Sequence, residues 1–251
     1  MTIAGYRVPL FASLIVWAII WEVVGRSGAT LVMPPLSAVL ARMVEIVPTP
    51  TFAAALWITG KTYFIGVLIS VVVGVPMGVI MGQSVIADRL LLPWVNLFLS
   101  APLTALVPVI MVLFGFGETT IILTVVLFAI WIIVLNARVG VRAISPSLIE
   151  MAACFGATRW QAFRHIYVWA ALPEILAGMR LGMIRAVKGV VIGQLLVSVV
   201  GFGRLFELYS SRFLMEHFWA LLFVLFAFAF AINETLAWLE RKVEYYAASR
   251  S

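Results

Sequence analysis

The sequence predicts an all-α membrane protein with six transmembrane helices in a single domain, residues 1–251. Hydrophobic residues make up 64% of the chain and charged residues 11%, whereas soluble domains average roughly 45–50% and about 25%. The mean hydropathy of +1.14 agrees with this composition. A helix needs about 20 apolar residues to cross a bilayer, so six helices use roughly 120 residues. We therefore expect a polytopic membrane protein rather than a soluble one.

The apolar residues fall into six runs with more polar segments between them. These runs are Val8–Gly25, Thr62–Gly82, Leu90–Phe114, Ile121–Ala137, Leu181–Val200 and Phe218–Leu239. We expect the first run to be retained as a span, because only Arg7 precedes it and no small-residue cleavage site follows it. Pro93, Pro102 and Pro108 interrupt the third run, which predicts a broken or kinked helix. Between the first two runs, Pro35–Pro48 has apolar residues at helical spacing and is expected to form a short interfacial helix.

The basic residues predict the orientation of the chain. The net charge is +6, and because these charges lie between apolar runs the expected partner is an anionic lipid surface rather than nucleic acid. With both termini in the cytoplasm, the inner segments carry Arg7, Arg89, Arg138, Arg142, Arg159, Arg164, Arg180, Arg241, Lys242 and Arg250. The outer segments carry half as many basic residues, namely Arg26, Arg42, Lys61, Arg204 and Arg212. This bias favours cytoplasmic termini.

The longest cytoplasmic segment spans about residues 138–180. Within it, a helical hairpin is expected at about 140–180. Ser147 and Glu150 have the spacing of a capping box, and so do Thr158 and Gln161. Gly156 lies between them, where a left-handed helix stop favours glycine. The pattern therefore predicts a helix, a glycine turn and a second helix.

The second helix of this hairpin is expected to end before Pro173. Apolar side chains are available on the hairpin for packing, namely Ala152, Ala153, Phe155, Trp160 and Phe163. Two interpretations remain open on physical grounds: a projection that docks a soluble partner, and an amphipathic pair that lies on the bilayer surface.

Two motifs carry a resemblance to a known family. The stretch Glu150–Gly156, followed by nine further residues and then Ile166, resembles the EAA loop of ABC importer permeases. The stretches Ala101–Pro108 and Phe114–Glu118 are similar to the nitrate/sulfonate/taurine branch of these permeases. Met151 and Val168-Trp169 depart from the family pattern.

The resemblance implies a type I importer permease in the bacterial inner membrane. It implies a second permease copy (a homodimer is expected), two cytoplasmic ATPase subunits and an external substrate-binding protein. The residues implied in coupling to the ATPase are Glu150, Ala152, Ala153, Gly156, Arg159, Ile166 and Pro173. No cofactor is expected on this chain, since ATP and magnesium would be bound by the partner ATPase. The expected function is ATP-driven uptake of a small polar or anionic solute.

The fifth run holds the candidates for the solute pathway. Arg185 and Lys188 lie at membrane depth, where an ionisable group usually faces a pathway or a partner. Gln194 is a third candidate, although an interhelical hydrogen bond would explain it equally well. Gly182 and Gly189 belong to a small-residue stripe, which indicates helix packing or sliding against a second copy during gating.

Other functional classes fit the sequence less well. Cys154 is the single cysteine, and the two histidines lie far apart in the chain, so no metal site is expected. Gly60-Lys61-Thr62 lacks the earlier glycine of a phosphate-binding loop, so the chain is not expected to be an ATPase. Two rivals remain: a secondary transporter or channel that needs no ATPase, and an intramembrane hydrolase built on Ser27 and His217.

Overall fold

The computed structural model describes residues 2–3, 6–7, 10–28, 30–197 and 199–248, and these are almost entirely helical. A two-residue antiparallel ladder, β1 (Thr2–Ile3) with β2 (Tyr6–Arg7), lies at the N-terminal end. The helices are α1 (Leu10–Arg26), α2 (Leu36–Ile46), α3 (Pro50–Gln83), α4 (Val85–Ser100), η1 (Leu103–Leu106), α5 (Val107–Phe114), α6 (Glu118–Arg142), α7 (Pro146–Cys154), α8 (Arg159–Ala162), η2 (Phe163–Tyr167), α9 (Val168–Val197), α10 (Gly201–Ser211) and α11 (Met215–Ala248). The all-α fold class is confirmed.

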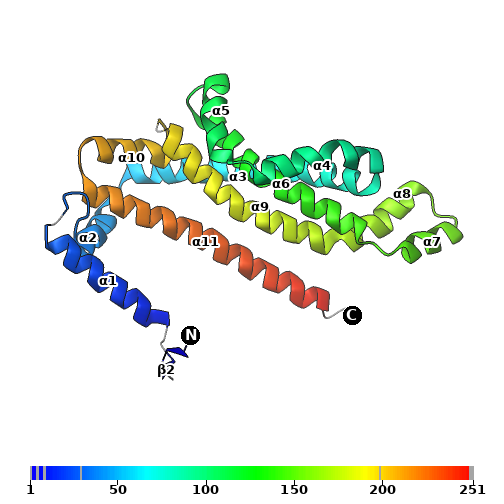
Figure 1. Cartoon of the computed structure of the whole chain (residues 1–251), viewed down its shortest axis with the longest axis horizontal. Coiled ribbons are helices and arrows are strands. Elements are labelled where there is room, and N and C mark those ends of the chain that lie inside the picture. The colour runs from blue at the N-terminus through cyan, green and yellow to red at the C-terminus, as the bar shows by residue number, and fades with distance from the viewer. Residues whose placement is uncertain (1, 4–5, 8–9, 29, 198, 249–251) are drawn as a thin grey trace.

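Three long helices, α3, α6 and α9, form the centre of the molecule (Figure 1). Glycines of α3 and the predicted glycine stripe of α9 both lie against α6. A Cβ atom on Gly78 would come within 2.4 Å of the Val134 carbonyl oxygen, and one on Gly182 would come within 2.5 Å of Ile133 Cγ1. Small residues thus allow the backbones to approach closely, as they do in membrane helix pairs.

The third apolar run is broken, as the prolines predict. α4 contains Pro93 and continues past it, and the break falls at Ala101-Pro102. The segment Leu103–Phe114 then leaves α4 at an angle of 99°, so that α5 projects from the bundle (Figure 1). Pro102 cannot donate the N–H that would continue the ladder of α4.

The number of spans is less regular than the six predicted. Among the described residues, three helices are long and apolar enough to cross a membrane: α3, α6 and Met215–Thr235 of α11. The number rises to 5 when α4–α5 and α9–α10 each count as one bent span. α1 has 17 residues, slightly fewer than the about 20 that a perpendicular span requires.

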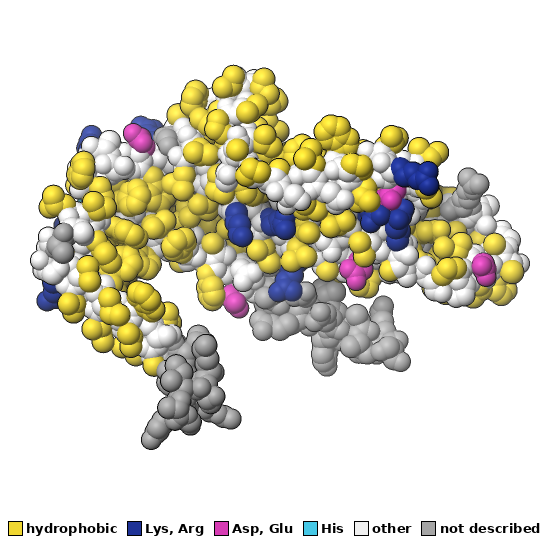
Figure 2. All heavy atoms as spheres, in the orientation of Figure 1, with side chains coloured by type: hydrophobic (Ala, Val, Ile, Leu, Met, Phe, Trp, Pro, Cys, Tyr) yellow, Lys and Arg dark blue, Asp and Glu magenta, His cyan; other side chains and the backbone are white. Residues whose placement is uncertain are grey.

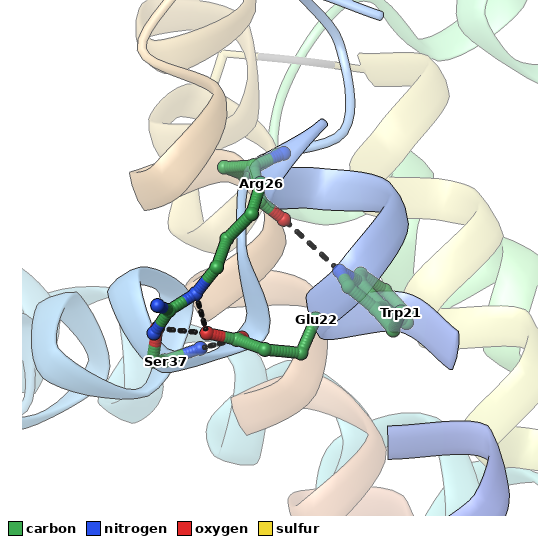
Figure 3. Close-up of polar contacts among 5 residues, drawn as sticks. Trp21, Glu22, Arg26 and Ser37 are labelled. Atoms are coloured by element: carbon green, nitrogen blue, oxygen red, sulfur yellow. Dashed lines mark hydrogen bonds and ion pairs between the residues drawn. The ribbon is translucent and has the colours of Figure 1, made fainter. Parts of the chain in front are cut away.

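The two terminal helices are attached to the bundle mainly at the end that carries α2 and α10 (Figure 1). A hydrophobic cluster joins α2, the start of α3, α10 and α11 there, with Phe202 and Leu221 fully buried. Figure 3 shows how α1 is attached: the Glu22 carboxylate accepts hydrogen bonds from Arg26 Nε and from Ser37 N–H and Oγ. The short helix expected between the first two apolar runs is α2, and it packs against both α1 and α11.

Candidate functional site

The hairpin predicted at about 140–180 is present and projects from the end of the bundle opposite α10 (Figure 1). Its turn is a Schellman motif, because Gly156 N–H donates to the Ala153 carbonyl and Ala157 N–H donates to the Ala152 carbonyl, both at 3.0 Å. Gly156 adopts a φ of +73°, the left-handed conformation expected from the sequence. A local sequence signal therefore defines the turn.

The two predicted capping boxes differ in outcome. Thr158 N–H donates to Gln161 Oε1 at 2.8 Å and Gln161 N–H donates to Thr158 Oγ1 at 3.3 Å, so this box is confirmed. The box at Ser147 and Glu150 is wrong. α7 begins one residue before Ser147, with Pro146 in its first turn, so Ser147 lies inside the helix and cannot cap it.

The second arm of the hairpin does not end before Pro173, so that expectation is also wrong. α8, one turn of π-helix at Phe163–Tyr167 (η2) and α9 follow each other without a break. Pro173 lies inside α9, and the helix continues past it although proline donates no N–H to the helical hydrogen-bond ladder. The hairpin arm and the predicted fifth span are consequently one continuous helix.

The exposed surface of the hairpin is largely apolar. Phe155 is 84% exposed and Trp160 is 67% exposed, while Glu150 and Ala153 are also exposed. A cavity of about 510 Å³ lies between the arms, lined by alanine side chains and by Gln83 from the end of α3. The side chain of Arg159, a predicted coupling residue, lies outside the described residues.

The base of the hairpin is packed firmly into the bundle. Ile166, another predicted coupling residue, packs with Ile149 and Tyr167 against a buried cluster of α6, α9 and the loop after α6. Its buried members are Ala137, Val141, Ile144, Ala171 and Ile175. Ala152 is itself buried, with 8% exposure. A force on the hairpin tip is therefore transmitted to the ends of α6 and α9.

The two cationic candidates both lie on α9. Arg185 is half-buried and Lys188 is exposed, and neither has an ion-pair partner among the described residues. Dark blue side chains are visible over the middle of α9 in Figure 2.

Gln194 does not lie on an accessible surface, so its interpretation as a pathway-lining residue is corrected. It is 1% exposed, and its Nε2 donates to Thr59 Oγ1 of α3 at 2.7 Å. A Cβ atom on Gly201 would come within 2.6 Å of the same Nε2. The amide is held at the junction of α3, α9 and α10, as the alternative of an interhelical hydrogen bond predicted.

The glycine face of α9 is also not available to a second copy. Gly182 lies against Ile133 and Gly189 lies against Thr124 and Val125, all on α6 of the same chain. The interpretation that these residues slide against a partner copy is therefore corrected to packing within one subunit.

The structure adds a charged cluster that the sequence analysis missed. Asp88, in the first turn of α4, is paired with Arg138 through both carboxylate oxygens and with Arg142 Nη2 at 2.8 Å. Its carboxylate is nearly buried. The spacing of the two arginines by four residues on α6 was the available signal, since such residues share a helix face.

The contacts described for Ser27 and His217, the two residues of the hydrolase alternative, are with other residues. Ser27 Oγ donates to the Val24 carbonyl at 2.7 Å, and the His217 ring lies 5.2 Å from that of Tyr209. Among the described residues, no group of three metal-ligating side chains is close enough to hold an ion.

Residues 74–245 match a protein family described as the inner membrane component of binding-protein-dependent transport systems. The chain belongs to this family. It is a membrane-embedded transport permease component, which confirms the family suggested by the two sequence motifs. Its several apolar helices agree with a multi-pass inner-membrane protein.

Curated relatives include permeases of the predicted branch. The chain is 30% identical to the taurine transport system permease protein TauC of Escherichia coli over 69% of its own length and 65% of that protein. It is 29% identical to a putative aliphatic sulfonates permease, SsuC of Bacillus subtilis, over 73% and 67% of the two chains. The riboflavin permease RibX of Chloroflexus aurantiacus is 37% identical over 45% of this chain, and the alignment spans only 42% of that protein.

The fold is shared with a solved importer. An inward-facing structure of the MetNI methionine ABC transporter contains a chain with a TM-score of 0.62 and 22% identity. The match covers 77% of this chain and 96% of that one, which supports the predicted type I permease fold.

Proposed function

We propose that the chain is one of two permease subunits that together form the solute pathway of an ABC importer. In this proposal two cytoplasmic ATPase subunits bind ATP and magnesium, and an external binding protein delivers a small polar or anionic solute. A second permease copy, identical in the simplest case, completes the assembly, because closed two-fold assemblies are the commonest solution.

The observation that carries this proposal is the hairpin. Its tip exposes apolar side chains, Phe155 and Trp160 among them, while its base is packed against the ends of α6 and α9. A partner that moves the tip therefore moves two central helices as well. Such a partner shifts the balance between inward-open and outward-open states only through different contacts with the two states.

The proposed orientation has the hairpin and both termini on the cytoplasmic side. α1 and α11 are joined to the bundle at the α2–α10 end and extend away from it, toward the side of the hairpin (Figure 1). In this arrangement α10 and α2 face the external binding protein.

Charge reversal at Glu150 tests the hairpin assignment. Glu150 is exposed, and we expect Glu150→Lys to remove the ATPase subunit from the purified permease, whereas the wild-type chain retains one ATPase per permease. The measurement is subunit stoichiometry after affinity purification. Glu207→Lys, an equally exposed change on α10, is the matched control and should retain the ATPase. ATPase-independent uptake by the purified permease would instead support the secondary transporter or channel.

Removal of the Arg185 charge tests the anionic substrate class. If Arg185 lines the pathway, Arg185→Ala should raise the KM for an aliphatic sulfonate about tenfold, the loss expected for one charge-assisted contact. Arg185→Lys, which keeps the positive charge at the same position, is the matched control and should retain most of the affinity. Unchanged sulfonate uptake by the Arg185→Ala variant, measured in proteoliposomes that contain the whole transporter, would contradict an anion-selective pathway.

A further inference from the structure

The cluster around Asp88 leaves cationic groups unneutralised. Asp88 is 7% exposed and shares its two carboxylate oxygens between Arg138 and Arg142. The side chain of Arg142 remains 40% exposed. Arg89, the next residue on α4, is exposed and has no ion-pair partner among the described residues. Three guanidinium groups thus accompany one carboxylate, and Figure 2 shows the blue side chains gathered where α4 and α6 meet.

Next to these cations, α4 presents a continuous apolar stripe. Ile86 is 74% exposed, Leu90 is 66% exposed, Trp94 is 57% exposed and Leu97 is 54% exposed. Their spacing of four, four and three residues places them on one face of the helix. Trp94 lies about 7.5 Å along the axis from Arg89 at 1.5 Å per residue, which is a favourable position for an indole near the membrane interface. Ile86 and Leu90 flank Arg89 in the sequence, so the apolar stripe begins beside the cationic groups and continues beyond them along α4.

We propose that this surface binds an anionic phospholipid, with the headgroup phosphate held by Arg89 and Arg142 and the acyl chains along the α4 stripe. In this proposal Asp88 orients the two arginines of α6. Its carboxylate accepts two hydrogen bonds from Arg138 and forms an ion pair with one guanidinium nitrogen of Arg142. The remaining guanidinium donors of Arg142 and all those of Arg89 suit a phosphodiester, which arginine binds through paired N–H groups. A basic site between helix ends on the cytoplasmic side is a known physical solution for binding anionic headgroups.

The assignment to the cytoplasmic leaflet rests on the proposed function, since it depends on the hairpin facing the cytoplasm. Lipid binding itself does not depend on that orientation. The apolar stripe favours a lipid over an acidic protein segment, because acyl chains and headgroup together match both parts of the surface.

The test is lipid retention by the permease, purified together with its ATPase subunits, from nanodiscs that contain equal amounts of phosphatidylglycerol and phosphatidylcholine. We expect native mass spectrometry to show preferential retention of phosphatidylglycerol by the wild-type chain. Arg89→Gln and Arg142→Gln should each lower that retention about fivefold, and Arg89→Lys should lower it less. Arg204→Gln, which removes a charge at an exposed position of α10, should not change it.

Three results would overturn the proposal. Equal retention of the two lipids by the wild-type chain would show that no anionic site exists. Displacement of phosphatidylglycerol by millimolar inorganic phosphate would show that the arginines hold a free anion rather than a lipid. Loss of the ATPase subunit from the Arg89→Gln chain, with lipid retention unchanged, would assign the surface to a protein partner. Lipid loss with the ATPase still bound would support the lipid site, whatever the outcome of the Glu150 experiment.

Discussion

Replacing Gly156 with proline should abolish ATP-driven uptake and release the ATPase from the permease. Gly156 has a φ of +73° and its N–H donates to the Ala153 carbonyl at 3.0 Å. Proline has no N–H and fixes φ near −65°, so neither the hydrogen bond nor the left-handed turn can form. A penalty of about 3 kcal/mol lowers the population of the intact turn by roughly two orders of magnitude.

The matched control is Gly28→Pro. Gly28 also adopts a left-handed conformation, with a φ of +65°, and has no neighbouring atoms within 4 Å. It lies directly after α1, away from the hairpin (Figure 1). Both variants carry the same backbone strain, so ATPase release from the Gly156 variant alone would show that the hairpin turn is what the ATPase requires. Normal uptake by the Gly156→Pro chain would refute the coupling role.

Substituting leucine for Gly78 should prevent the chain from accumulating as a folded protein. A Cβ atom at this position would meet the Val134 carbonyl oxygen at 2.4 Å and the Ala137 Cβ at 2.7 Å. A backbone oxygen cannot rotate out of the way, so α3 and α6 must separate along their contact. We expect a destabilisation of about 3 kcal/mol or more, at the upper end of overpacking effects. Size-exclusion chromatography of a fluorescent fusion measures the folded fraction.

Gly60 provides the control on the same helix. No atom lies within 4 Å of a Cβ atom built there, so Gly60→Leu should leave the folded fraction unchanged. Gly182→Leu extends the test to α9, where Ile133 Cγ1 lies at 2.5 Å, and should behave like Gly78→Leu. A Gly182→Leu chain that folds and assembles normally would contradict the packing role of this glycine.

The sequence alone predicted the features that depend on neighbouring residues. The membrane class followed from composition, the broken third run from its prolines, and the hairpin turn from Gly156 together with the Thr158 and Gln161 box. Two local predictions were wrong because a proline can stand at the start of a helix or inside one, as well as after its end. Pro146 begins α7 and displaces the box at Ser147, while Pro173 lies within α9 and does not end the hairpin arm.

What the tertiary structure decided is which surfaces pair. Gln194 and Arg185 both lie within the same apolar run. Gln194 is nevertheless 1% exposed and hydrogen-bonded to Thr59. Arg185 is half-buried and has no ion-pair partner in the described part of the chain. Asp88 pairs with Arg142 and with Arg138, and Arg138 lies 50 positions further along the chain. Helical periodicity fixes which residues share a face, because it depends on a repeat of 3.6 residues. It cannot specify which neighbour covers that face, because that depends on the close approach of helices that are distant in sequence.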